Sequence, residues 1–104
     1  MTTATDREFM QQGAAKAAAL LRTVGNEQKL LVLCLLIDQG EASVGTLLEQ
    51  VNLSQSALSQ HLAKLRGFGL VHTRRDRQMI YYSCDSEPVR KMLSAVTEIY
   101  GPVP

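Results

Sequence analysis

The sequence has few residues of the kinds that cross-link or interrupt a chain. Among 104 residues there are two cysteines and three prolines. Cys34 and Cys84 stand fifty positions apart, with no Cys-x-x-Cys motif and no histidine cluster nearby, which argues against a disulfide framework. All the prolines lie at position 88 or later, and no repeat, low-complexity block or Pro/Gly-rich linker divides the chain. We therefore expect one domain over residues 1–104.

The sequence also lacks a long hydrophobic run. The longest, Leu30–Ile37, has eight residues, whereas a helix needs about 20 to cross a bilayer. This run predicts a helix buried on most sides, and no membrane partner. The first ten residues, MTTATDREFM, lack the basic start and apolar stretch of a secretion signal, so we expect a cytoplasmic location. Hydrophobic residues make up 45% of the chain and charged residues 20%, which is typical of a globular protein.

The net charge of +1 is distributed unevenly along the chain. Residues 54–84 carry five basic side chains and one acidic side chain, a net charge of +4. Residues 1–53 carry four basic and six acidic side chains (−2), and residues 85–104 carry two and three (−1). A local excess of positive charge favours an anionic polymer such as nucleic acid as a partner. The same basic side chains are also compatible with a solvated face.

Hydrophobic periodicity predicts a mostly α-helical fold with five helices and a β-hairpin. Residues 43–66 are predicted to form two short helices joined by a turn of three or four residues. This arrangement is typical of a helix-turn-helix. Between positions 70 and 84, two β-rich runs flank a charged loop and predict the hairpin. The helices are expected at 6–23, from an Asn26 cap to the break at Gly40, from Ser43 for about two turns, from a Ser54 cap to Arg66, and at 88–100.

The helix over residues 54–66 has an unusual exposed face. On a helical wheel Leu58, Leu62 and Leu65 fall together and should face the core. The opposite side carries slim, mostly uncharged polar side chains, where a solvated helix would normally carry Glu and Lys. Because Gln pairs bidentately with adenine and Ser bonds to base edges or phosphates, this composition predicts a surface that reads DNA.

Basic residues at the hairpin tip supply the positive charge that a DNA-binding surface needs. Three arginines there would let the hairpin act as a wing along the phosphates or in the minor groove. The alternative is a loop kept soluble by its charge. Gln55 lies nearer the buried side of the wheel, but its long side chain should still reach the groove. The candidate DNA-binding residues are Ser54, Gln55, Ser56, Ser59, Gln60, His61, Lys64, Arg74, Arg75 and Arg77.

The run SVGTLLEQVNLSQSALSQHLAKLRGFGLVHTRRDRQMIYY resembles the ArsR/SmtB family of dimeric winged-helix repressors, and the similarity extends over roughly residues 14–101. The resemblance implies a winged helix-turn-helix that forms a homodimer through its terminal helices. Apolar stripes on both terminal helices agree with this, because a small domain cannot cover them alone. The candidate dimer residues are Met10, Ala14, Ala17, Leu21, Met92, Leu93, Val96, Ile99 and Tyr100.

Some members of that family bind a metal, through Cys-x-Cys in the third helix or through Asp, His and Glu pairs on the last helix. Neither pattern occurs here, and the two histidines, His61 and His72, belong to the DNA-facing region. We therefore expect no metal and no other cofactor. Ser59 and Cys34 lack the accompanying base of a nucleophilic catalyst, so we expect no enzymatic activity.

Cys34 is the candidate thiol sensor. It matches the helix-two cysteine of a dithiol branch of the family that responds to persulfides or oxidants, but the partner position reads Gly101. A buried thiol packed as a small hydrophobe is the simpler interpretation. We thus predict a sequence-specific repressor that binds a pseudo-palindromic operator as a homodimer. The alternatives are a thiol-responsive repressor and a winged-helix protein–protein interaction module.

Overall fold

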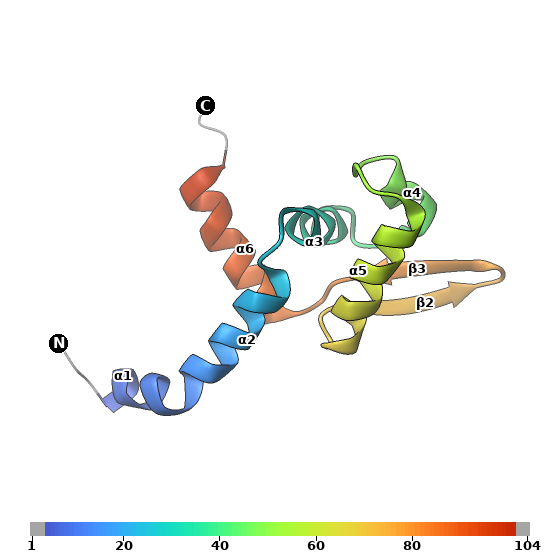
Figure 1. Cartoon of the computed structure of the whole chain (residues 1–104). Coiled ribbons are helices and arrows are strands. Elements are labelled where there is room, and N and C mark those ends of the chain that lie inside the picture. Colours follow the sequence, from blue (N-terminus) through green and yellow to red (C-terminus); the bar gives the residue numbers. More distant parts are fainter. Residues whose placement is uncertain (1–3, 102–104) are drawn as a thin grey trace.

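The computed structural model describes residues 4–101 as a mostly helical fold with a three-stranded antiparallel sheet (Figure 1). Residues 1–3 and 102–104, the ends of the predicted domain, lie outside the described part. Within it, no helix is long and apolar enough to span a membrane. The elements are α1 (Ala4–Glu8), η1 (Phe9–Gly13), α2 (Ala14–Val24), α3 (Glu27–Gln39), β1 (Ala42–Ser43), α4 (Val44–Leu48), α5 (Gln55–Gly67), β2 (His72–Asp76), β3 (Met79–Ser83) and α6 (Glu87–Tyr100).

The first three segments follow one another without a break and correspond to the single helix expected over residues 6–23. Their middle part, η1, is a π-helical turn in which the amide of Ala14 donates to the carbonyl of Phe9. Gly13 accommodates the Phe9 ring, since a Cβ at Gly13 would lie 2.9 Å from Phe9 Cδ1. The sequence periodicity predicted the helix but not this change of helix type.

Side-chain caps fix where the central helices begin. Asn26 Oδ1 accepts hydrogen bonds from the amides of Gln28 (2.9 Å) and Lys29 (3.2 Å) at the start of α3. Ser43 Oγ caps α4, and Ser54 Oγ caps α5. The caps at Asn26 and Ser54 were predicted, and Ser43 was predicted as the start of its helix. Each cap satisfies amides that have no partner within the helix. Ser86 caps α6 in the same way, so this helix begins at Glu87, one residue before the predicted start at Pro88.

The sheet has the strand order β1-β3-β2. The predicted hairpin is confirmed as β2 and β3, which pair from His72↔Ser83 to Asp76↔Met79 around a two-residue turn. The sequence analysis missed β1, whose two residues pair with Tyr82 and Tyr81 of β3. A two-residue strand is too short to give an alternating pattern, and its partner lies about forty positions away in the chain.

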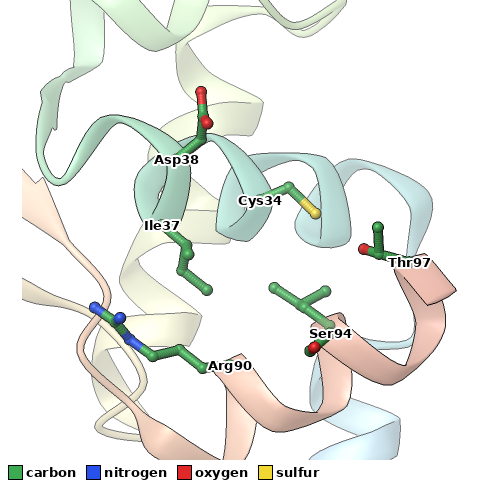
Figure 2. Close-up of a pocket in the computed structure, with 7 residues that line it drawn as sticks. Cys34, Ile37, Asp38, Arg90, Ser94 and Thr97 are labelled. Carbon is green, nitrogen blue, oxygen red and sulfur yellow. The ribbon is translucent and has the colours of Figure 1, made fainter. Parts of the chain in front are cut away.

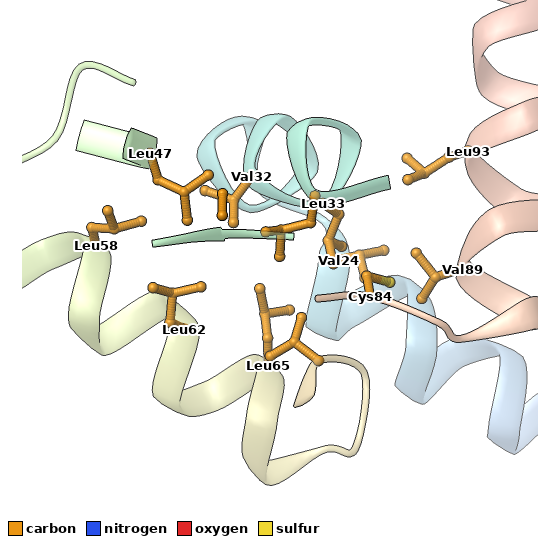
Figure 3. Close-up of a cluster of buried hydrophobic side chains, with 13 residues drawn as sticks. Val24, Val32, Leu33, Leu47, Leu58, Leu62, Leu65, Cys84, Val89 and Leu93 are labelled. Atoms are coloured by element: carbon orange, nitrogen blue, oxygen red, sulfur yellow. The ribbon is translucent and has the colours of Figure 1, made fainter. Parts of the chain in front are cut away.

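The core lies where α3, α4, α5 and the base of the sheet meet (Figure 3). Leu58, Leu62 and Leu65 are fully buried, which confirms the predicted inward face of α5. The other core residues are Val24, Val32, Leu33, Leu36, Ala42, Leu47, Val71, Cys84, Val89 and Leu93. Burial of these side chains holds α5 against α3 and leaves its opposite side free.

The expectation that α3 is buried on most sides holds except along one strip. Val32, Leu33 and Leu36 are buried, and Leu30, Leu35 and Ile37 pack partly buried against the core. Leu31 and Cys34 are exposed, and the side that carries Cys34 borders a groove. A continuous apolar run does not show which side of a helix meets the core. Cys34 is therefore not the buried thiol that was expected, whereas Cys84 is buried.

The described chain is elongated. Its radius of gyration is 15.6 Å, compared with about 13 Å for a compact domain of this length. Figure 1 shows the N-terminal helical segments and α6 extending away from the helix-turn-helix and the hairpin. Large apolar side chains are exposed on both of these extensions, among them Met10 and Ile99.

Candidate nucleic-acid interface

The two helices of the helix-turn-helix are α4 and α5. Residues 49–54 connect them, a longer turn than the three or four residues predicted. Apolar spacing continues to Val51, but α4 ends at Leu48, and the amides of Gln50 and Val51 both donate to the carbonyl of Leu47 as the chain turns. The turn still brings Ser54 to the point where α5 begins, so the geometry of the motif is kept.

The predicted reading face of α5 is exposed in the structure. Lys64 and the polar residues nearer the start of the helix, including Gln60, have exposed side chains. Gln55 is exposed as well, so its position near the buried side of the wheel does not remove it from this face. The structure thus brings Ser54, Gln55, Ser56, Ser59, Gln60 and Lys64 to the exposed side of α5.

His61 stands at the edge of this face and is half-buried. Its Nδ1 atom is buried and has no hydrogen-bond partner among the described residues. Burial lowers the pKa of the ring, and the positive charges of Lys29 and Lys64 lower it further. His61 is therefore uncharged at neutral pH, and its imidazole adds no positive charge to the surface.

The hairpin presents its basic residues at and near its tip. Arg75 and Arg77 are exposed and take part in no salt bridge within residues 4–101. Arg77 lies in the turn with a φ of 59°, the left-handed region that side-chain-bearing residues seldom adopt. Both guanidinium groups are therefore free to meet an anion such as a phosphate.

Arg74 differs from its two neighbours because its charge is already paired. Its Nη2 donates to Glu41 Oε1 at 2.6 Å and its Nε donates to Glu41 Oε2 at 3.2 Å. Its guanidinium also lies over the Tyr81 ring, 4.7 Å from the ring centroid. The hydrogen bonds from Arg74 hold the pKa of Glu41 below its usual value. The sequence analysis missed Glu41, which is 33 positions from Arg74 and belongs to no recognisable motif.

The predicted dimer residues lie on the two extensions of the protomer. Met10, Ala14, Leu21 and Val96 are exposed, and Ile99 and Tyr100 are 69% and 81% exposed. Ala17 and Met92 are half-buried. Leu93 is only 7% exposed and packs in the core of the protomer. The first half of the apolar stripe on α6 therefore packs on the core, and its second half is exposed to solvent.

A groove of about 330 Å³ separates α3 from α6 (Figure 2). The groove is lined by Cys34, Ile37 and Asp38 of α3 and by Arg90, Leu93, Ser94 and Thr97 of α6. Ile37 points toward α6, whereas the Asp38 carboxylate points away from it (Figure 2). Partial desolvation at the wall of the groove raises the pKa of the Cys34 thiol, and burial raises the pKa of Cys84. Within residues 4–101, no group of three or more His, Cys, Asp or Glu side chains is arranged to hold a metal ion.

A capped helix with a slim polar face, set beside a basic hairpin, defines a winged helix-turn-helix domain. Residues 26–73 match the family described as "Bacterial regulatory protein, arsR family". The chain belongs to this family, and it is a DNA-binding transcriptional regulator rather than an enzyme.

Individual relatives cover most of the chain. The nodulation protein NolR of Rhizobium meliloti is 51% identical over 90 residues, which are 86% of this chain and 73% of NolR. The transcriptional activator HlyU of Vibrio cholerae is 46% identical over 91 residues, 88% of this chain and 83% of HlyU. The crystal structure of the transcriptional repressor BigR from Xylella fastidiosa superposes with a TM-score of 0.85 at 35% identity, covering 99% of this chain and all of that one.

Proposed function

We propose that the protein is a homodimeric repressor that places one α5 in the major groove of each half of a pseudo-palindromic operator. The observation that carries this proposal is the exposed face of α5, which is slim, polar and uncharged where the helix begins and is flanked by free wing arginines. On this proposal the DNA contacts come from Ser54, Gln55, Ser56, Ser59, Gln60, His61 and Lys64 on α5, and from the wing.

The uncovered terminal helices support the homodimer. Met10 and Leu21 of the N-terminal segments are exposed, and the second half of α6 leaves Ile99 and Tyr100 in solvent. Apolar side chains gathered on two projecting helices are typical of a protein–protein interface. A second copy of the chain would cover both helices at once across a two-fold axis, and the same axis would match a palindromic DNA site.

Repression follows from occupancy, because a dimer bound over a promoter excludes other proteins from that DNA. Among the relatives, BigR carries the name of a repressor and HlyU that of an activator, so the sign of regulation needs its own measurement. We place the protein in the cytoplasm, where a bacterial regulator meets the chromosome. Transcription from the bound promoter in vitro should fall as the protein is added, and a rise would identify an activator.

Binding to genomic fragments at two salt concentrations tests the proposal as a whole. We expect a small set of fragments to bind specifically at about 100 mM salt, and their affinity to fall steeply as salt is raised, because phosphate contacts release counterions. Binding without any sequence preference would contradict the repressor. It would favour the second class of function, a protein–protein interaction module built on the same fold.

A thiol-responsive repressor is the second candidate, because Cys34 is exposed beside the groove. Against it stand Gly101 at the expected partner position, the burial of Cys84 and the raised pKa of the Cys34 thiol, which lowers the reactive thiolate fraction. We expect a persulfide donor to change operator affinity by less than about tenfold. A larger loss that disappears in Cys34→Ser would establish the sulfur-responsive function instead.

A further inference from the structure

One row of residues runs across all three strands of the sheet at the base of the wing. In the strand pairing, Arg74 of β2 lies opposite Tyr81 of the central strand β3, and Tyr81 lies opposite Ser43 of β1. Glu41 directly precedes β1 in the chain. The Arg74 side chain lies over the Tyr81 ring and reaches Glu41, so it links the outer strand of the hairpin to the segment that leads into β1. We call Glu41, Arg74 and Tyr81 the Arg74 strap.

The strap uses the two properties that distinguish arginine from lysine. The edge of the guanidinium donates two hydrogen bonds to the two oxygens of the Glu41 carboxylate, and its flat face lies over an aromatic ring. An exposed pair with one contact would contribute little, but a bidentate pair stacked on a ring has its geometry fixed from two directions.

The strap connects the wing to the helix-turn-helix. Ser43 ends β1, and its Oγ caps α4 by accepting a hydrogen bond from the amide of Thr46 at 3.2 Å. The backbone of β1 contributes only two residue pairs to the sheet. A short strand therefore joins the two DNA-facing parts, and the Arg74 strap is a second link between the same parts.

We propose that Glu41 and Arg74 are positioning residues that hold the wing at a fixed angle to α4 and α5, so that the guanidinium groups of Arg75 and Arg77 meet the DNA backbone. Arg74 itself does not contact phosphate. This proposal rests on the proposed DNA-binding function, and it gives Arg74 a different role from the direct contact that its sequence position suggested.

Glu41→Gln distinguishes a positioning role from a simple electrostatic effect, because the two predict changes of opposite sign in operator affinity. Removing a negative charge near the wing should by itself leave DNA binding unchanged or strengthen it. Positioning predicts a loss of operator affinity of about fivefold, the upper end for an exposed ion pair, with the salt dependence unchanged. Glu49→Gln is the matched control, since it removes the same charge from the exposed end of α4, outside the strap. Affinity in this control should stay level or rise.

Arg74→Lys tests the same point from the other partner. Lysine keeps the positive charge but loses the bidentate geometry, so it should bind the operator about as weakly as Arg74→Ala if Arg74 positions the wing. If Arg74 contacts a phosphate, lysine should retain most of the affinity. The double variant Glu41→Gln/Arg74→Lys should be no weaker than either single variant, because both remove one shared interaction.

Hydrogen exchange without DNA keeps this proposal distinguishable from the proposed function. In Glu41→Gln the amides of β1 and β3 should exchange faster by up to about fivefold, while those of α6 stay unchanged. If the wild-type protein binds DNA without any sequence preference, the proposed function is refuted. If amide exchange in Glu41→Gln is the same as in wild type, the linking role of the Arg74 strap is refuted, whatever the result with DNA. If wild type binds specifically and Glu41→Gln binds equally well or better, the positioning role is wrong.

Discussion

Single residues on α5 differ in what they can recognise. Gln60 has a long amide side chain and lies beside the small Ser56 and Ser59. It is exposed in the first half of the helix, the part that reads bases in this motif. Gln60→Ala should cost roughly 1–3 kcal/mol on the best operator and leave non-specific binding nearly intact, because one bidentate base contact is lost. Competition between the operator and unrelated DNA measures this difference.

Arg77 should behave in the opposite way. A guanidinium on a wing turn contacts phosphates, so Arg77→Ala should weaken binding to every sequence and lower the salt slope by about 1. If the Gln60 and Arg77 variants lose affinity in the same pattern, the division between base reading and phosphate contact is wrong.

The backbone at Arg77 supplies a matched control. With its φ of 59°, alanine keeps an unfavourable conformation there, whereas glycine adopts it freely. Arg77→Gly should therefore unfold with a free energy about 1–2 kcal/mol higher than Arg77→Ala, yet bind DNA equally weakly. Urea unfolding beside DNA titration separates the lost charge from the backbone strain.

At the scale of elements, local signals in the sequence predicted local features well. The caps at Asn26 and Ser54, the helix start at Ser43 and the inward leucines of α5 depend on neighbours within a few positions, and all are confirmed. Features made by distant segments were missed, namely β1, the Glu41–Arg74 pair and the exposed side of α3. The spacing of apolar residues along a helix does not show which of its faces is covered by another element.

The packing of α5 beside α3 makes stability depend on pH through His61. Its pKa is lowered in the folded protein, so folding favours the neutral ring. The neutral His61 ring therefore contributes to the free energy of unfolding at pH values above its pKa in the unfolded chain, about 6.5. This contribution is lost as the pH falls through the lower pKa of the folded protein. Urea unfolding between pH 8 and pH 5 should show this loss in wild type and a smaller loss in His61→Gln. The same slope in His61→Gln would mean that other groups cause it.

At the scale of the whole molecule, the apolar surface is distributed unevenly. The core gathers at the junction of the helix-turn-helix and the sheet, while the uncovered apolar side chains of α6 lie far from the wing (Figures 1 and 3). On the proposed function, the end that carries the wing would face DNA and the end of α6 would meet a second copy. Both surfaces remain predictions from the sequence, whereas Leu93, predicted for the dimer interface, packs in the core of the chain instead.

Ile99 tests the dimer end directly. Its side chain is 69% exposed and lies outside the core, so Ile99→Glu should fold normally in the monomer. In a dimer the substitution would bury a carboxylate against apolar side chains, which costs several kcal/mol and should shift the protein to monomers. Sedimentation should show this shift, and operator affinity should fall because two half-sites are no longer bound together.

Met79 provides the matched control, because it is also a large exposed apolar residue, at 47%, but it lies on β3 of the hairpin, away from the terminal helices (Figure 1). Met79→Glu should leave the oligomeric state unchanged in the absence of DNA. If Ile99→Glu remains dimeric and Met79→Glu does not, the interface lies on the hairpin side of the molecule and not on the terminal helices. A two-fold axis through the hairpins would then set the spacing of the half-sites.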